Sequence, residues 1–275
     1  MTNPPRVAFI GGGNMVRSLV GGLLARGHPR HLLGVSEPLR TVRDTLARDF
    51  GIDVVSDNAA VLEGADLVVL AVKPQHMKEV CAGIAAHRAV PPVTFISVAA
   101  GVRLAQLERW LGSGAKVVRA MPNTPALIGA GITGLIANDK VGADGRALAA
   151  EVLGAAGRTI WIEREQLMDA VTAVSGSGPA YFFLLLEALE AAGIAQGLPA
   201  EAARELASHT ALGAARMACA GDVAPAQLRE RVTSPGGTTQ AALEVLEAGG
   251  FRRLVADAVA SATRRGAELS ERLGD

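Results

Sequence analysis

Short apolar runs alternate with amphipathic stretches along the first 163 residues of the chain. The runs are nearly continuous in apolar residues, which is typical of parallel strands covered on both faces. They lie at residues 6–10, 32–36, 52–55, 66–72, 93–98 and 116–120. Between them, apolar residues recur at the three- and four-residue spacing of helices, at residues 16–26, 41–49, 75–87 and 104–111. This alternation predicts repeated βαβ units and a doubly wound sheet.

Only helical periodicity continues after Trp161, and glycine or proline marks most of the breaks. The helical segments are residues 167–174, 179–193, 200–220, 225–232, 239–248 and 251–273. We therefore predict an α/β chain with a doubly wound sheet in residues 1–163 and an all-helical domain in residues 164–275. The apolar faces of the helical half exceed what one short bundle buries, which predicts a partner subunit.

Charge and cysteine usage narrow the class of protein. Lys plus Arg and Asp plus Glu number 27 each, so no basic field is available to attract nucleic acid or an anionic membrane. The two cysteines, Cys81 and Cys219, are far apart, which argues against a zinc site and against a disulfide framework. We expect no metal, no nucleic acid and a reducing cytoplasm.

Neither a secretory signal nor a membrane span is expected. Residues 1–6 lack the apolar core and small-residue cleavage site of a signal peptide. The most apolar stretch, residues 180–195, is interrupted by Glu187 and Glu190 and is too short to cross a bilayer. These features predict a soluble protein.

A glycine-rich turn follows the first predicted strand and opens the first predicted helix, the context in which a G-x-G-x-x-G/A pattern carries weight. Gly11 permits the tight turn, and Gly13 lets the backbone approach a pyrophosphate whose charge the helix N-terminus stabilises. Val16 stands where a small residue is usual and is expected to push the helix slightly off the strand. The pattern predicts a Rossmann-type dinucleotide site.

Charged residues after the second strand bear on the choice of dinucleotide. Glu37 stands about where an acidic residue accepts the ribose 2′-hydroxyl of NAD. Arg40 and Arg43 lie just beyond and are placed to hold the 2′-phosphate of NADP instead. All three also suit solvated loop positions, so the choice between NAD and NADP stays open.

Two further strand ends are candidates for the cofactor. Lys73 closes the fourth strand at the carboxyl edge, where a cation suits a phosphate or the nicotinamide ribose. Residues 97–101 follow the next strand and are small, which leaves room for the nicotinamide.

Two turns in the later part of the chain open helices. Residues 175–181 form a glycine-serine turn with Pro179 in the first helical turn, where its missing N–H costs nothing. Residues 234–239 offer free backbone N–H groups and two hydroxyls that suit a carboxylate, although an ordinary helix cap has the same features.

These motifs, in their order, resemble those of the pyrroline-5-carboxylate reductases. The similarity extends from about residue 7 to 270 and includes residues 11–15, 71–75, 99–101, 119–125, 175–181 and 234–239. It implies an N-terminal Rossmann-type domain and a C-terminal helical dimerisation domain, with homodimers that can associate into homodecamers. Glu37 departs from the family, which often has Ser or another neutral group there, and this puts a preference for NADP in doubt.

The resemblance and the strand-end positions together give the expected site for NADPH or NADH. The predicted cofactor contacts are Ile10, Gly11, Gly12, Gly13, Asn14, Met15, Glu37, Asn58, Ala71, Val72, Lys73, Pro74, Ala99 and Ala100. The predicted substrate contacts are Glu165, Ser234, Gly236, Gly237, Thr238 and Thr239, with Thr239 as the candidate catalytic residue.

The implied reaction delivers a hydride to the C=N carbon of 1-pyrroline-5-carboxylate and forms L-proline, the last step of proline biosynthesis. A protonated iminium needs position rather than a strong general acid. A 3-hydroxyacid dehydrogenase needs a Lys or His base, yet no lysine follows Lys140 and His209 is the only histidine in the helical half. A reductase of a six-membered imine stays open, because one methylene is worth only about 1–3 kcal/mol. A non-catalytic nucleotide-binding protein is disfavoured because the glycine-serine turn at residues 175–181 and the loop at residues 234–239 are both intact.

Overall fold

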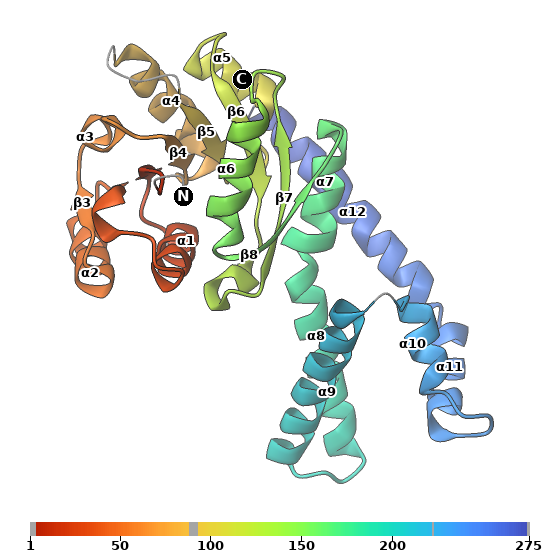
Figure 1. Ribbon diagram of the computed structural model, residues 1–275. Coiled ribbons are helices and arrows are strands. Elements are labelled where there is room, and N and C mark those ends of the chain that lie inside the picture. Colours follow the sequence, from red (N-terminus) through yellow and green to blue (C-terminus); the bar gives the residue numbers. More distant parts are fainter. Residues whose placement is uncertain (1–3, 88–92, 222, 274–275) are drawn as a thin grey trace. The chain divides into compact units, whose positions relative to one another are not determined.

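The computed structural model describes residues 4–87, 93–221 and 223–273 (Figure 1). Within them, one sheet has the strand order β3-β2-β1-β4-β5-β6-β7-β8. The strands are β1 Val7–Ile10, β2 Leu33–Ser36, β3 Asp53–Val55, β4 Leu67–Leu70, β5 Thr94–Ser97, β6 Lys116–Met121, β7 Gly131–Ala137 and β8 Gly157–Trp161. Every neighbouring pair is parallel except β6 and β7, which are antiparallel.

The helices that alternate with these strands confirm the predicted doubly wound plan. They are α1 Asn14–Ala25, α2 Arg40–Phe50, α3 Asn58–Leu62, α4 Met77–Ala86, α5 Leu104–Leu111 and α6 Ala143–Gly154, with short 3-10 turns η1 Arg30–Leu32, η2 Pro74–His76 and η3 Thr124–Ile128. The later helices are η4 Glu165–Leu167, α7 Met168–Val171, the π-helical turn η5 Thr172–Gly176, α8 Gly178–Ala195, α9 Ala200–Ala220, α10 Pro225–Arg231, α11 Thr238–Ala248 and α12 Phe251–Arg272.

Side chains alternate between the two faces of the sheet, as the pleat requires. Val7 and Phe9 of β1 join α1, α2 and α6 in one buried cluster, whereas Ala8 and Ile10 join α3, α4 and α5 in the other. Val16 is fully buried in the first cluster, so the core accommodates it where a smaller residue is usual. The two covered faces explain why the strands read as continuous apolar runs.

The sequence reading missed β7 and β8. Two glycines interrupt the apolar pattern of β7, and β8 alternates half-buried and exposed residues at the edge of the sheet. Gly134 in β7 has a packing role, because a Cβ there would lie 2.6 Å from Cγ1 of Val171. The sheet therefore extends two strands beyond the predicted ones, and α7 packs against its added part.

By compactness, the chain divides into one unit of residues 1–177 and 261–275 and a second unit of residues 178–260. This division differs from the predicted domain boundary at 163/164, because two segments predicted to belong to the helical domain fall in the sheet unit. Residues 164–177 stay with the sheet because Met168 is fully buried in the second cluster. Residues 261–273 return to the sheet, with Ser270 buried and Leu273 packed against the same cluster.

The second unit pairs α8 with α9 and carries many exposed apolar side chains. A close approach at Gly193, where a Cβ would lie 3.3 Å from that of Ala203, brings the two helices together. Arg204 of α9 forms a two-oxygen ion pair with Glu190 of α8. The large exposed apolar residues of this unit include Phe182, Phe183, Leu184, Leu206, Met217, Val245, Leu246 and Leu254. Uncovered apolar area of this extent is typical of an interaction surface.

The apolar stretch at residues 180–195 belongs to a longer helical run, Glu165–Ala195, so the prediction that it is too short to cross a bilayer is wrong by length and composition. Of the most apolar window of this run, 6% is buried. Glu190 lies in this run, and its carboxylate is paired with Arg204. Exposure of an apolar helix face is equally expected for a helix that packs on another subunit.

Candidate functional site

The glycine turn between β1 and α1 has the geometry of a phosphate-binding loop. Gly11 has a φ of +100°, and a Cβ there would lie 2.9 Å from the Ala71 carbonyl oxygen. Gly13 caps α1 without a side-chain hydrogen bond, and a Cβ there would meet nothing within 4 Å. The N–H groups of the first turn of α1 are therefore open to a phosphate, with the positive end of the helix dipole behind them.

Glu37, directly after β2, faces this turn. Its Oε2 accepts a hydrogen bond from the Gly12 N–H (2.9 Å) and its Oε1 accepts one from the Leu39 N–H (2.9 Å). Arg43 of α2 donates from Nη1 to the carbonyl oxygens of Glu37 (2.8 Å) and Pro38 (2.7 Å). The carboxylate is thus held in one place beside the glycine turn.

The other predicted cofactor residues follow neighbouring parallel strands in the same unit. Asn58 begins α3 after β3, and its Oδ1 accepts a hydrogen bond from the Ser36 hydroxyl (2.6 Å). Lys73 is exposed just after β4. Ala99 is buried and Ala100 exposed just after β5. Because parallel strands end at a common edge, the structure gathers the predicted cofactor residues at one edge of the sheet.

Glu165 belongs to the sheet unit and is engaged by other protein groups. Its Oε1 accepts hydrogen bonds from the Leu104 N–H (2.7 Å) and from Nη1 of Arg119 (3.1 Å). Nη2 of Arg119 lies 3.8 Å from Oδ1 of Asp169, and the Arg119 side chain is only 4% exposed. In the structure, the Glu165 carboxylate thus has two protein partners, both on Oε1. Its contact with a substrate stays a prediction.

The sequence motif at residues 119–125 includes Arg119 but does not predict that it pairs with two carboxylates, those of Glu165 and Asp169. The sequence carries a signal for it: Arg119 is a charged residue that follows two valines inside a predicted strand, and a buried cation needs partners. Its carboxylate partners, Glu165 and Asp169, lie 46 and 50 residues further along the chain. Local sequence spacing therefore does not identify them.

A cavity of about 340 Å³ opens beside the cofactor edge. Its lining includes Pro74 and Ala100, both predicted cofactor residues, together with Asp169 and residues in the last turns of α12. Its full lining is Pro74, Gln75, Ala100, Gly101, Asp169, Thr172, Gly266, Leu269, Arg272 and Leu273. The cavity thus lies beside both the carboxyl edge of the sheet and Asp169, which pairs with Arg119.

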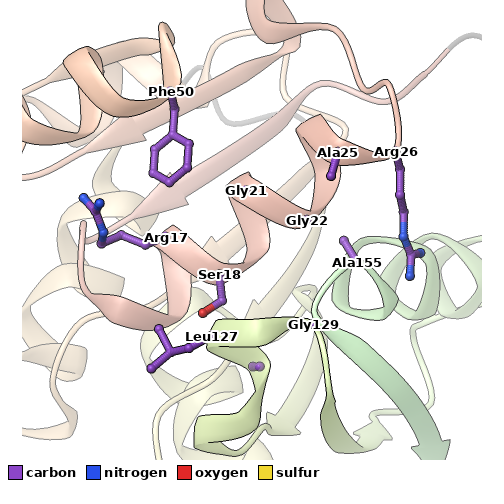
Figure 2. A pocket seen from close by; sticks show the side chains of 11 residues that line it. Arg17, Ser18, Gly21, Gly22, Ala25, Arg26, Phe50, Leu127, Gly129 and Ala155 are labelled. Carbon is purple, nitrogen blue, oxygen red and sulfur yellow. The ribbon is translucent and has the colours of Figure 1, made fainter.

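A larger cavity of about 520 Å³ is lined by α1 together with Phe50, residues of the 126–129 segment and Ala155, and is a different feature (Figure 2). The guanidinium of Arg17 is engaged by Asp49 and that of Arg26 by the Gly154 carbonyl. The lining residues are Arg17, Ser18, Gly21, Gly22, Ala25, Arg26, Phe50, Ala126, Leu127, Gly129 and Ala155, none of which is a predicted site residue. We therefore place the candidate site at the sheet edge and not in this larger cavity.

The glycine-serine turn meets the 119–125 motif within the sheet unit. The Ser175 carbonyl accepts a hydrogen bond from Nδ2 of Asn123 (3.1 Å), and a Cβ on Gly176 would lie 2.6 Å from Cε of Met121. Both contacts fall in the π-helical turn η5, a geometry that is frequent at functional sites.

The 234–239 loop lies in the second unit and opens α11. Gly236 has a φ of +71°, and its N–H donates to Oε1 of Gln240 (2.7 Å), while the Gly237 N–H donates to the Ser234 carbonyl (3.0 Å). Two N–H groups expected to be free are therefore engaged within the loop. Helix α11 has no side-chain cap, so the N–H groups of its first turn, at Thr238, Thr239 and Gln240, are available to an anion.

The two cysteines differ in exposure: Cys81 is buried and Cys219 is exposed. Burial raises the pKa of the Cys81 thiol to about 12, so it stays neutral and unreactive in the folded protein. No group of three or more His, Cys, Asp or Glu side chains in the described part of the chain is arranged to hold a metal ion.

The fold and the sheet-edge site define a two-domain dinucleotide-dependent oxidoreductase, with a Rossmann-type sheet followed by helices. The chain is 51% identical, over 98% of its own length and 98% of the relative's, to the pyrroline-5-carboxylate reductase of Pseudomonas aeruginosa. It belongs to the pyrroline-5-carboxylate reductase family.

Family models and solved structures agree with this assignment. Residues 6–101 match the model described as NADP oxidoreductase coenzyme F420-dependent, and residues 165–269 match that of pyrroline-5-carboxylate reductase dimerisation. The chain is similar to a pyrroline-5-carboxylate reductase from Coxiella burnetii, with a TM-score of 0.94, 43% identity, and coverage of 97% of this chain and 99% of that one. It is also similar to the Plasmodium falciparum pyrroline carboxylate reductase with NADP bound. That comparison has a TM-score of 0.84 and 29% identity, and it covers 98% of this chain and 100% of that one.

Proposed function

We propose that this protein reduces 1-pyrroline-5-carboxylate to L-proline with NADH or NADPH, the last step of proline biosynthesis. The observation that carries the proposal is a sheet edge built to hold a dinucleotide, in a chain whose full-length relatives are named pyrroline-5-carboxylate reductases. The Plasmodium falciparum relative contains NADP, which supports use of a nicotinamide dinucleotide.

The residues present fit such a cofactor, which supplies the hydride when bound. The uncapped first turn of α1 would hold the pyrophosphate, and Glu37 would hold the adenosine ribose. The small residues Ala99 and Ala100 leave space at the next strand end, beside the 340 Å³ cavity.

The substrate needs to be positioned more than it needs to be activated. In the iminium form its nitrogen is already protonated, so the hydride forms a C–H bond at the ring carbon and the C=N π pair becomes the amine lone pair. The N–H groups of Thr238 and Thr239 would fix the carboxylate, and their hydroxyls add donors to the same anion.

A 3-hydroxyacid dehydrogenase is the weaker candidate because it requires a base. No lysine follows Lys140 in the sequence, and His209 is an exposed residue of α9. A missing base hinders alcohol oxidation and leaves imine reduction unaffected.

A direct assay tests the proposed activity. Oxidation of NADH and of NADPH is followed with 1-pyrroline-5-carboxylate and with its six-membered analogue, side by side. We expect turnover of the five-membered imine with a higher kcat/KM than the six-membered one. Turnover of only the larger ring, or of neither, would contradict the proposal, and growth of a proline auxotroph that carries the coding sequence gives an independent readout.

Thr239 tests the substrate loop. We expect Thr239→Ala to lower kcat/KM by a factor of about ten or more, because it removes a hydroxyl placed to hold the carboxylate or to relay a proton. Steady-state kinetics measure the effect, with Thr210→Ala on the exposed surface of α9 as the matched control. Full activity of Thr239→Ala would remove this residue from the mechanism.

The exposed apolar side chains of the second unit support a homodimer, in line with the dimerisation model that residues 165–269 match. We propose that dimers associate further into a decamer and that the protein works in the cytoplasm. Size-exclusion chromatography with light scattering tests the assembly, and a species of monomer mass alone would count against it.

A further inference from the structure

We infer that Glu37 makes this protein select NADH over NADPH. The inference deepens the proposed function, but it concerns the binding of the dinucleotide alone and does not need the imine reaction to take place. The Plasmodium falciparum structure contains NADP, so the family fold accommodates a 2′-phosphate, and selection depends on the residues that each chain places after β2.

The Glu37 carboxylate is fixed by the backbone on two sides. The Gly12 N–H and the Leu39 N–H each donate to a different carboxylate oxygen, both at 2.9 Å. The Glu37 N–H donates to the Val55 carbonyl (2.9 Å), so the backbone of this residue is also anchored to β3. Withdrawal of the carboxylate to admit a phosphate would break both side-chain bonds.

The carboxylate keeps capacity for a ribose. An ionised carboxylate accepts at about four lone-pair positions, and two backbone donors use two of them. Two positions remain for the 2′- and 3′-hydroxyls, which are donors. A 2′-phosphate offers acceptors only and brings a charge of about −1.5 to −2 against a fixed negative group.

The nearby cations do not neutralise this carboxylate by contact. Arg43 uses Nη1 to hold the carbonyls of Glu37 and Pro38, and among the described residues it forms no ion pair with the Glu37 carboxylate. Arg40 is highly exposed and lies 3.6 Å from the Asp44 carboxylate. In the described part of the chain, Arg43 therefore supports the loop and Arg40 lies beside an aspartate.

The test measures cofactor affinity without substrate. Isothermal titration of the full-length protein with NAD⁺ and with NADP⁺ gives two dissociation constants, and we expect NADP⁺ to bind at least about fivefold more weakly. Glu37→Gln retains the size and one acceptor for the backbone N–H groups while it removes the charge, and Glu37→Ser removes the group. Both changes should bring the ratio of the two constants below that of the wild type by a factor of about five or more.

Asp139→Ser is the matched control for loss of a carboxylate. Asp139 is exposed and follows β7, which runs antiparallel to β6, so it lies at the opposite edge of the sheet. For Asp139→Ser, the ratio of the NADP⁺ and NAD⁺ dissociation constants should equal that of the wild type. A wild-type ratio below fivefold, or a ratio that Glu37→Gln leaves unchanged, would overturn the inference. Because binding is measured alone, a protein that selects NAD⁺ but fails to reduce the imine would refute only the proposed function.

Discussion

Replacement of Arg119 by leucine is expected to lower the free energy of unfolding by about 1.5–3 kcal/mol, because it leaves two partly buried carboxylates without their cation. The Arg119 side chain is 4% exposed and contacts Glu165 at 3.1 Å and Asp169 at 3.8 Å, whose side chains are 25% and 15% exposed. Loss of the guanidinium also removes the tie between β6 and the 165–171 segment. Urea denaturation at a fixed protein concentration measures the change.

Arg158→Leu serves as the control for this substitution. Arg158 is also a strand residue, in β8, but its side chain is exposed, so its loss should change stability by less than about 0.5 kcal/mol. A further replacement of Glu165 by leucine in the Arg119→Leu protein should restore part of the stability, since one uncompensated charge is removed. A loss below about 1 kcal/mol for Arg119→Leu would show that the cluster is not a major source of stability.

Gly11→Ala is expected both to destabilise the sheet unit and to weaken dinucleotide binding. A φ of +100° is strained for any residue with a Cβ, and the new atom would lie 2.9 Å from the Ala71 carbonyl oxygen. Strain of this kind costs about 1–3 kcal/mol, and relief requires the glycine turn to move away from β4. Since the turn precedes α1, its movement shifts the N–H groups that would bind the pyrophosphate.

Two measurements separate these effects. Urea denaturation should show the loss of stability, and titration with NAD⁺ should show an affinity reduced by about tenfold or more. Gly114→Ala is the control, because a Cβ at Gly114 would meet nothing within 4 Å. Wild-type affinity and stability in Gly11→Ala would contradict the assigned role of the turn.

Local sequence patterns predict the first six strands of the sheet, β1 to β6. Burial on both faces makes each of these strands a continuous apolar run, and the three- and four-residue spacing reveals the helices between them. The failure at β7 has a local cause as well: Gly131 and Gly134 interrupt the apolar run, and both are required where other backbone or side-chain atoms approach closely. Those approaches involve Ala126 and Val171, and no local spacing shows them.

The sequence by itself determined the doubly wound plan, the helical second half, the glycine turn and the position of Glu37 after β2, because each depends on residues close together in the chain. Only the tertiary structure decided what the charged groups do: the Glu37 carboxylate is held by Gly12, Arg43 supports carbonyls, and Arg119 pairs with Glu165 and Asp169. The reason is that hydrogen bonds and ion pairs depend on distances of a few ångströms between separate segments, which periodicity and spacing do not encode.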